Sequence, residues 1–183
     1  MLRPILLIGF MCSGKTTLGR ALARRLQVPF TDLDAEIERC ESMSIGDIFR
    51  SRGEETFRRI EEQTLTRVLA GASGGVIALG GGTPCRAGAM ARLDKAGITV
   101  WLEPSPERLT ARLMNGRATR PLLQGINSEA EMSEFVISKM EERRPYYELA
   151  QYCFDSSRLE TEEEISDTVE QFVASIIDPA SNS

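Results

Sequence analysis

Short apolar runs alternate with longer amphipathic segments along the whole chain. Each apolar run is four or five residues long and is followed by turn residues or by a helical pattern, which is typical of a buried strand. Central strands of a parallel sheet are apolar throughout because both of their faces are covered. The alternation therefore predicts a three-layer α/β/α fold with a central five-stranded parallel sheet. The predicted strands are Ile5–Gly9, Pro29–Asp32, Val76–Leu79, Ile98–Leu102 and Tyr152–Asp155.

Between the strands, apolar residues recur at the spacing of an amphipathic helix. The segment Thr16–Gln27 has leucines at every fourth position, which places them on one face. Ser44 is a typical N-cap for a helix that begins at Ile45. Pro145 is expected to kink or interrupt the long helix in which it lies. The remaining helices are predicted over Gly53–Ala70, Ser105–Leu113, Ser128–Leu149 and Glu162–Ile177.

Two segments do not fit the simple alternation. Residues 34–70 carry two or three helical patterns where one crossover helix would be enough, so we interpret part of them as an inserted substrate module. Residues 115–127 contain glycine and arginine without any periodicity, and loops of this length are uncommon unless they bind ligands or act as lids. We predict one domain over residues 1–183, with a substrate-binding insert at about 34–61 and a lid at about 115–127.

Composition narrows the functional classes. A hydrophobic fraction of 42% and a charged fraction of 27% are those of a globular protein, and a net charge of −5 argues against nucleic acid as the main partner. The chain has no histidine and no pair of cysteines at C-x-x-C spacing, so zinc sites and histidine-based triads are not expected. The first apolar run is too short to span a membrane and no cleavage site follows it. We therefore expect a cytoplasmic protein without membrane association, and a monomer by default.

The segment Gly9–Thr16 matches the phosphate-binding pattern G-x-x-x-x-G-K-[ST] in full, with an apolar strand before it and an amphipathic helix after it. Backbone N–H groups of such a loop surround phosphate oxygens, and the positive end of the following helix adds to the attraction. Lys15 is suited to the β- and γ-phosphates and Thr16 to Mg²⁺. The alternative, a glycine-containing turn with a solvated lysine, explains the context less well. The predicted ATP-binding residues are Cys12, Ser13, Gly14, Lys15, Thr16 and Thr17.

Asp32 and Asp34 lie where the second predicted strand ends. Ligands of such sheets bind at the carboxyl ends of the strands, and residues two apart in a strand point to the same side. One carboxylate near Mg²⁺ and one near an acceptor hydroxyl would suit phosphoryl transfer. Asp34 is equally typical of an N-cap for a helix over Ala35–Cys40, and the residues alone leave both interpretations open.

The glycine triplet Gly80–Gly82 directly follows the third predicted strand. Three glycines at this edge allow a ligand to approach the backbone closely, although a flexible turn is the alternative. Planar guanidinium groups suit carboxylate and phosphate oxygens, and an arginine on a mobile loop can stabilise the transferred phosphoryl group. Periodicity does not separate functional arginines from solvated ones. The candidates are Arg58, Arg59, Arg120 and Arg143.

Taken together, these motifs resemble the shikimate kinase family, in the nucleoside-monophosphate-kinase-like branch of P-loop proteins, over nearly the whole chain. The resemblance implies ATP- and Mg²⁺-dependent phosphorylation of the 3-hydroxyl of shikimate, on the pathway to chorismate and the aromatic amino acids. The motifs that carry it are Gly9–Thr16, Thr31–Asp34, Ile48-Phe49, Gly53-Glu54, Phe57–Glu61, Leu79–Gly82, Arg120–Leu123 and Arg143–Tyr147.

The resemblance also implies roles for individual residues. Catalysis would rest on Lys15, on Asp34 as base or orienting group for the acceptor hydroxyl, and on Arg120, which would reach the γ-phosphate with the lid. Thr16 would bind Mg²⁺ directly and Asp32 would hold it through water, while Arg117 would contact the adenine side. The shikimate-binding set would be Asp34, Arg58, Gly80, Gly81, Gly82 and Arg143.

The chain departs from the family pattern at Cys12, where members usually have glycine. The substitution is costly if this position needs a positive φ, and tolerable otherwise. Gluconate kinase or another small-molecule kinase of the same fold is the neighbouring interpretation. Adenylate kinase fits less well because the lid is short. A regulatory paralogue without catalysis is disfavoured because Lys15, Thr16, Asp32, Asp34 and Arg120 are all retained.

Overall fold

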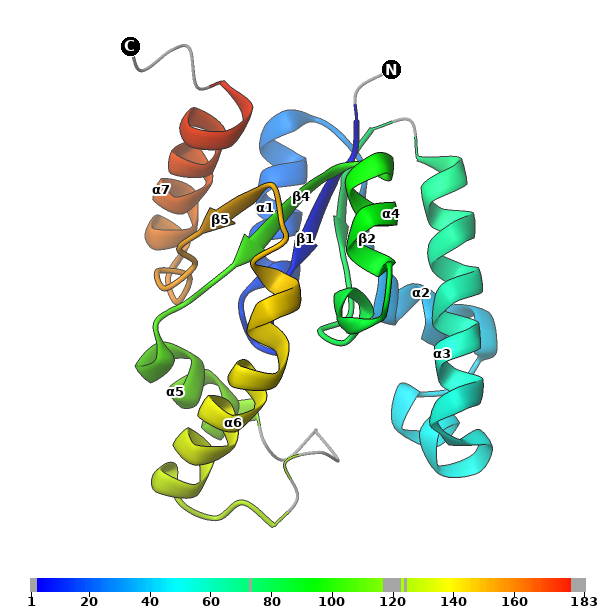
Figure 1. Cartoon of the computed structure of the whole chain (residues 1–183). Helices are drawn as coiled ribbons and strands as arrows, with labels where there is room; N and C mark the ends of the chain where they lie inside the picture. Colours follow the sequence, from blue (N-terminus) through cyan, green and yellow to red (C-terminus); the bar gives the residue numbers. More distant parts are fainter. Residues whose placement is uncertain (1–2, 73, 117–122, 124, 179–183) are drawn as a thin grey trace.

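A five-stranded sheet forms the centre of the structure, a computed structural model that describes residues 3–72, 74–116, 123 and 125–178 (Figure 1). All paired strands are parallel, and their order across the sheet is β2-β3-β1-β4-β5. The predicted sheet is thus confirmed. The strands are β1 (Ile5–Ile8), β2 (Phe30–Asp32), β3 (Val76–Ala78), β4 (Ile98–Leu102) and β5 (Tyr152–Phe154).

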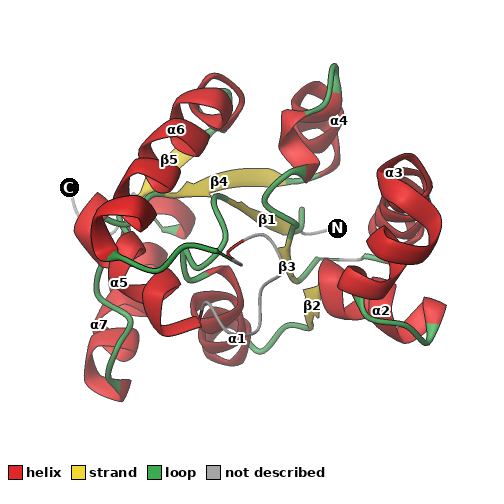
Figure 2. Ribbon diagram, turned by 90° about the horizontal axis from the view of Figure 1, so that it is seen from below, coloured by secondary structure: helices red, strands yellow, loops and turns green. Residues whose placement is uncertain are grey.

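The central strand β1 explains why the fold has three layers. Its four residues are buried, and alternate side chains point to opposite faces of the sheet. Leu6 and Ile8 pack into a core with α2 (Leu33–Glu41), α3 (Ile45–Gly71) and α4 (Ala89–Ala96), whereas Ile5 and Leu7 pack into a second core with α1 (Lys15–Leu26) and α7 (Glu162–Phe172). Figure 2 shows these two groups of helices on opposite sides of the sheet, as the continuous apolar runs predicted.

The helices connect the strands in chain order. The helices α1, α5, α6 and α7 agree with predicted segments, whereas α4 was not predicted. The helix α6 continues through Pro145 and ends two residues beyond it, at Tyr147, so it ends near the proline as expected but is not interrupted there; a proline in the last turn costs one hydrogen bond close to an end where bonds are already lost. The helices are α1 (Lys15–Leu26), α2 (Leu33–Glu41), α3 (Ile45–Gly71), α4 (Ala89–Ala96), α5 (Pro106–Gly116), α6 (Glu129–Tyr147) and α7 (Glu162–Phe172), with a 3₁₀-helix at Thr83–Cys85 and a π-helical turn at Val173–Ile177.

The helix α3 is broken at Gly53, where φ is 77° and ψ is 169°. Its first part begins as predicted at Ser44, whose hydroxyl accepts a hydrogen bond of 3.1 Å from the amide of Asp47. Only glycine takes up the backbone angles at position 53 without strain, so the two predicted helical segments join here at an angle. Both α2 and α3 lie between β2 and β3 in the chain, which is the extra helical material that the sequence indicated.

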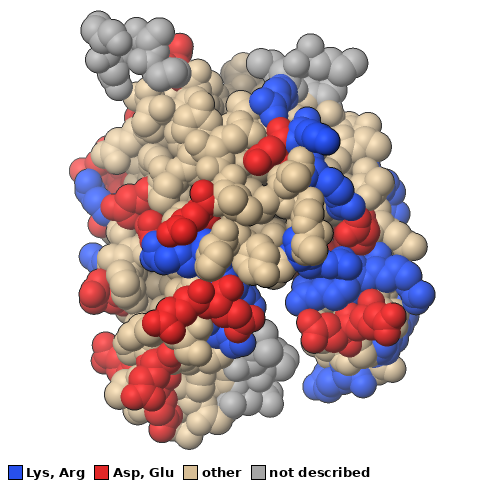
Figure 3. Space-filling model, in the orientation of Figure 1, with Lys and Arg blue, Asp and Glu red and all other residues tan. Residues whose placement is uncertain are grey.

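The carboxyl ends of the strands meet at one edge of the sheet, which faces downward in Figure 1. The helix pair α5 and α6 extends beyond this edge on one side, and the pair α2 and α3 on the other. Figure 3 shows the surface hollowed between these two lobes. Within the described ranges, no helix combines the length and the apolar composition needed to cross a lipid bilayer. The phosphate loop, Asp32–Asp34 and the glycine triplet lie at this edge, at the ends of β1, β2 and β3.

Candidate active site

The loop between β1 and α1 is held in an unusual backbone path. Gly9, Cys12 and Gly14 have φ values of 140°, 62° and 95°. The amide of Ser13 donates to the carbonyl of Phe10 across the turn, at 3.2 Å. A side chain at position 14 would place its Cβ 2.3 Å from Cδ1 of Leu159, so only glycine fits there. The predicted strand–loop–helix context of the phosphate motif is therefore confirmed.

Lys15 lies across this loop. Its ammonium group donates to the carbonyls of Gly9 at 2.9 Å and Phe10 at 2.7 Å. Burial lowers the pKa of Lys15 to about 8, and the nearby carboxylate of Asp34 is the main influence that keeps it from falling further. Lys15 is therefore still protonated at neutral pH, and it occupies a position where phosphate oxygens can replace the backbone carbonyls as acceptors.

Asp32 joins the phosphate loop to the beginning of α2. Its Oδ2 accepts a hydrogen bond of 2.7 Å from the Thr16 hydroxyl, and its Oδ1 accepts from the amides of Asp34 at 3.1 Å and Ala35 at 3.4 Å. Asp32, not Asp34, is thus the N-cap of α2, and the alternative that gave Asp34 this role was wrong. The strand ends at Asp32, as predicted, and α2 begins at Leu33, so Asp34 lies in the first turn of α2 and strand alternation does not relate it to Asp32.

Asp34 points to the glycine triplet. A Cβ at Gly80 would lie 3.0 Å from Oδ1 of Asp34 and equally close to Oε1 of Glu61, so any larger residue would push these two carboxylates away. Burial raises the pKa of Asp34 to about 6, against the opposing effect of Lys15 and with smaller contributions from Asp32 and Glu61. A carboxylate with a pKa close to neutrality is well matched to accepting a proton from a hydroxyl at physiological pH.

Each glycine of the triplet leaves space for one of the predicted side chains. Gly80 lies against Asp34, as above; a Cβ at Gly81 would lie 3.2 Å from Nη1 of Arg143; and a Cβ at Gly82 would lie 3.1 Å from Nη1 of Arg58. We call Asp34, Arg58 and Arg143, together with Gly80–Gly82, the triplet cluster. Residues that are far apart in the sequence are therefore brought together by the absence of three side chains.

The two arginines of the triplet cluster differ in how far they are neutralised. Arg58 pairs with Glu61 at 3.1 Å and with the exposed Glu54 at 3.2 Å. Arg143 lies over the ring of Phe10, 5.2 Å from its centroid, and forms no ion pair with a carboxylate in the described part of the chain. A guanidinium group without a carboxylate partner remains available to an anionic ligand. Arg59, in contrast, is exposed and lies outside the cluster.

Glu61 is a functional candidate that the sequence reasoning missed. It is only 2% exposed, and the hydroxyl of Thr83 donates to its Oε1 at 2.7 Å. A buried carboxylate needs such partners because burying an unpaired charge is costly. Glu61 therefore holds the guanidinium group of Arg58 at Gly82. The spacing of Arg58 and Glu61, three apart on one helix, was the signal that could have revealed the pair.

A hollow of about 380 Å³ lies on the other side of the phosphate loop. Arg112 of α5 was not predicted there: its Nε donates to Glu160 at 3.0 Å and its Nη2 to the carbonyl of Ser157 at 3.0 Å, while its buried Nη1 has no partner among the described residues. Nothing in the local sequence marks Arg112. Arg117 and Arg120, which were predicted for the adenine side and the γ-phosphate, lie outside the described residues. The hollow is lined by Cys12, Gly14, Lys15, Thr16, Thr17, Arg112, Leu159 and Glu160.

Cys12 stands where similar loops usually have glycine, and it adopts the left-handed backbone conformation. This is the case in which the sequence predicted that a Cβ would be costly. Its φ of 62° would cost a residue with a Cβ about 1–2 kcal/mol relative to glycine. The side chain is half-buried and packs against the cluster around Phe10 and Leu109. Ser13 is buried, and its carbonyl accepts a hydrogen bond of 2.7 Å from the hydroxyl of Ser156. This loop is thus fixed by contacts from the segment that follows β5.

Comparison with known proteins gives a consistent result. The model of the family described as shikimate kinase matches residues 11–174. A shikimate kinase of Bacteroides fragilis is 40% identical over 167 residues, which cover 91% of this chain and 92% of that protein. The crystal structure of a shikimate kinase from Bacteroides thetaiotaomicron has a TM-score of 0.88 at 37% identity, and covers 97% of this chain and 99% of its own. A shikimate kinase from Acinetobacter baumannii, solved in complex with shikimate, has a TM-score of 0.81 at 32% identity, covering 98% and 95%.

Proposed function

The chain belongs to the shikimate kinase family of ATP-dependent kinases, and we propose that its phosphate loop and triplet cluster transfer the γ-phosphoryl group of ATP to the 3-hydroxyl of shikimate. The observation that carries the assignment of residues is the convergence of Asp34, Arg58 and Arg143 on three successive glycines beside Lys15. A carboxylate that can accept a proton and two guanidinium groups that can bind an anion are what an acid bearing a hydroxyl requires.

The nucleotide is proposed to bind in the hollow beside α1. Lys15 would exchange its bonds to the loop carbonyls for bonds to the β- and γ-phosphates, with the amides of Ser13, Gly14, Thr16 and Thr17 around them. The orphan Nη1 of Arg112 supports a contact between Arg112 and the nucleotide, which we propose in addition to the contact assigned to Arg117. Arg120 keeps the role at the γ-phosphate that the resemblance implied.

The oxygens of Thr16 and Asp32 fit a magnesium site. Magnesium prefers oxygen ligands and commonly takes only one or two from the protein, with phosphate and water oxygens completing its shell. The hydroxyl of Thr16 and Oδ2 of Asp32 are 2.7 Å apart at the start of α1, which supports Thr16 as a direct ligand and Asp32 as a partner through water. The ion would supply charge neutralisation for the phosphates.

On the acceptor side, Arg143 and Arg58 would bind the carboxylate of shikimate. Arg143 would contribute most, because it is not neutralised by a carboxylate of the described chain, whereas Arg58 already shares its charge with Glu61. Asp34 would accept a hydrogen bond from the 3-hydroxyl and take its proton as the phosphoryl group is transferred. Its pKa of about 6 keeps it largely ionised at pH 7 and still basic enough for this task.

The organisation of the domain follows from this assignment. We take residues 34–61 as the substrate-binding insert, since they contain Asp34, Arg58 and Glu61, and residues 115–127 as the lid, most of which lies outside the described residues. The net charge of −5 supports the absence of nucleic acid among the partners. A monomer in the cytoplasm, without membrane association, completes the proposal.

A coupled assay of ADP release tests the function directly. We expect turnover with ATP and shikimate, and none above background with gluconate or AMP as acceptor. Binding of ATP without turnover on shikimate would contradict the proposal, and turnover on gluconate would favour the neighbouring small-molecule kinase instead.

A further inference from the structure

We propose that Tyr147 is a positioning residue for the triplet cluster: its hydroxyl fixes the Gly81 peptide against the end of α6, and so sets the place of Arg143. The inference rests on the function proposed above, because it concerns how the carboxylate of the acceptor is received. It adds a residue that neither touches the reacting atoms nor belongs to the predicted site.

The contact between Tyr147 and Gly81 is short and partly buried. The hydroxyl of Tyr147, a fully buried residue, donates a hydrogen bond of 2.6 Å to the carbonyl of Gly81. Its ring packs against Trp101, with the ring centroids 5.8 Å apart. Burial raises the pKa of Tyr147 above its ordinary value, so the hydroxyl remains a donor across the physiological range. Within the described residues, the other donor to this carbonyl is the Cys85 thiol at 3.8 Å, which is a weaker partner, so the orientation of the carbonyl depends mainly on Tyr147.

The peptide between Gly81 and Gly82 transmits this orientation. In a trans peptide the carbonyl and the following N–H lie in one plane and point in opposite directions. Fixing the carbonyl of Gly81 on Tyr147 therefore directs the N–H of Gly82 away from Tyr147. The carbonyls of Gly80 and Gly82 accept hydrogen bonds of 3.1 Å from the amides of Thr83 and Cys85, whereas the carbonyl of Gly81 is oriented by a side chain. The N–H groups of Gly81 and Gly82 have no acceptor in the described part of the chain, which leaves both available to a ligand.

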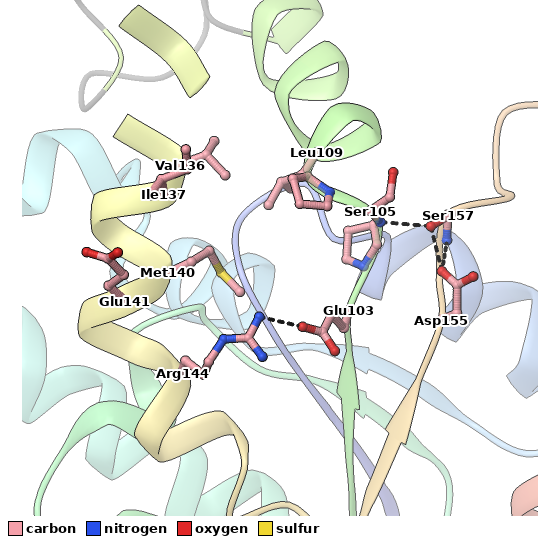
Figure 4. Close-up of a pocket in the computed structure, with 12 residues that line it drawn as sticks. Glu103, Ser105, Leu109, Val136, Ile137, Met140, Glu141, Arg144, Asp155 and Ser157 are labelled. Atoms are coloured by element: carbon pink, nitrogen blue, oxygen red, sulfur yellow. Dashed lines mark hydrogen bonds and ion pairs between the residues drawn. The ribbon is translucent and has the colours of Figure 1, made fainter. Parts of the chain in front are cut away.

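Arg143 lies in the last turns of α6, and its neighbours Arg144 and Tyr147 connect these turns to the rest of the protein. On the outer side, Arg144 pairs with Glu103 at 2.7 Å and lies over the ring of Trp101, 5.1 Å from its centroid. Figure 4 shows this ion pair at the edge of a separate hollow of about 490 Å³ between α5, α6 and the end of β4. An exposed ion pair of this kind contributes little. The inner attachment is the partly buried bond of Tyr147 to Gly81, where a Cβ would lie 3.2 Å from Nη1 of Arg143.

The test compares Tyr147→Phe with Tyr146→Phe. Both remove one hydroxyl from neighbouring tyrosines of α6, but the side chain of Tyr146 is 37% exposed and forms no hydrogen bond within the described residues, so it controls for the substitution itself. We expect Tyr147→Phe to raise the KM for shikimate about fivefold to tenfold, the effect of one lost hydrogen bond, while kcat and the KM for ATP stay within about twofold. Tyr146→Phe should match the wild type in all three constants.

Thermal unfolding of both variants separates positioning from packing. Tyr147→Phe keeps the ring and its contact with Trp101, so it should fold, with or without a small loss in Tm. An unchanged KM for shikimate in an active enzyme would overturn this inference alone, whatever the change in Tm. An equal rise in both KM values would overturn it as well, because a general loosening of the fold is then the explanation. A wild type without turnover on shikimate would overturn the proposed function, and this inference with it.

Discussion

The negative charge of Asp34 lowers the stability of the fold but is needed for the proposed catalysis, and the substitution Asp34→Asn separates these two effects. Burial raises its pKa from 3.8 to about 6, so the folded state binds this proton more tightly than the unfolded state does. The stability that Asp34 contributes in its neutral form is complete below pH 3.8 and is lost as the pH rises through about 6. Above that pH, the folded protein carries a carboxylate that it accommodates at a cost. Asparagine has nearly the same shape and removes the charge.

The size of the effect follows from the shift in pKa. A shift of roughly two units corresponds to about 3 kcal/mol, since one unit is about 1.4 kcal/mol. Because Asp34 is only half-buried, we discount this value for solvent screening and expect the variant to be more stable by about 1–2 kcal/mol at pH 7.5. For a chain of this length, that gain raises Tm by about 3–8 °C. The gain should fall to roughly a third at pH 4.5, where the folded wild type keeps its proton.

The assay is urea unfolding of wild type and variant between pH 4.5 and 8, with turnover measured alongside. The variant should lose at least about 100-fold in kcat, because the proton acceptor is gone, while it keeps its affinity for ATP. Asp167→Asn, at an exposed position on α7, serves as the control and should change neither property. A variant that is less stable than the wild type at pH 7.5, or a gain that does not depend on pH, would refute the reasoning.

The other predictions concern the remaining parts of the site. Arg143→Ala should raise the KM for shikimate at least about tenfold with little change in that for ATP, because it removes a charged donor; steady-state kinetics would exclude Arg143 from the site if the KM is unchanged. Arg112→Ala should instead raise the KM for ATP about tenfold and spare shikimate, whereas Arg108→Ala on the exposed side of α5 should do neither. Cys12→Gly should be more stable than Cys12→Ala by about 1 kcal/mol in urea unfolding, because only glycine accepts the left-handed φ without strain. Equal stability would mean that the loop relaxes out of that conformation.

Much of the fold was predictable because burial on both faces of a parallel sheet leaves an unambiguous pattern. Every predicted strand is present, and no end differs from the prediction by more than one residue. The helix α4 was missed for a physical reason: it has eight residues, and its N-cap is Gly88, which makes no side-chain cap. Short helices of this kind are stabilised by tertiary packing, here by Met90 and Leu93 in the core, and not by local signals.

The site was predictable where a motif fixes the backbone locally. The phosphate loop satisfies that condition, and so does the glycine triplet. The position of Asp34 was not predictable from alternation, because β2 has three residues and α2 begins immediately after it. Glu61 had a local signal in its spacing from Arg58, but its contact with Thr83 spans 22 residues and that of Arg112 with Glu160 spans 48. Contacts of this kind depend on how the chain folds back, and a single sequence contains no record of them.

The two carboxylate oxygens of Asp32 accept different hydrogen bonds: Oδ1 caps α2, and Oδ2 accepts from the Thr16 hydroxyl. This division restricts which residues the position can hold. Asparagine would keep one oxygen but would present an amide N–H₂ group to a hydroxyl donor or to a cation, and glutamate is too long to cap the helix from the same backbone position. A single carboxylate thus ties the geometry of the nucleotide side to the helix that carries Asp34. A substitution at position 32 therefore alters both the Thr16 side of the site and the helix that carries Asp34.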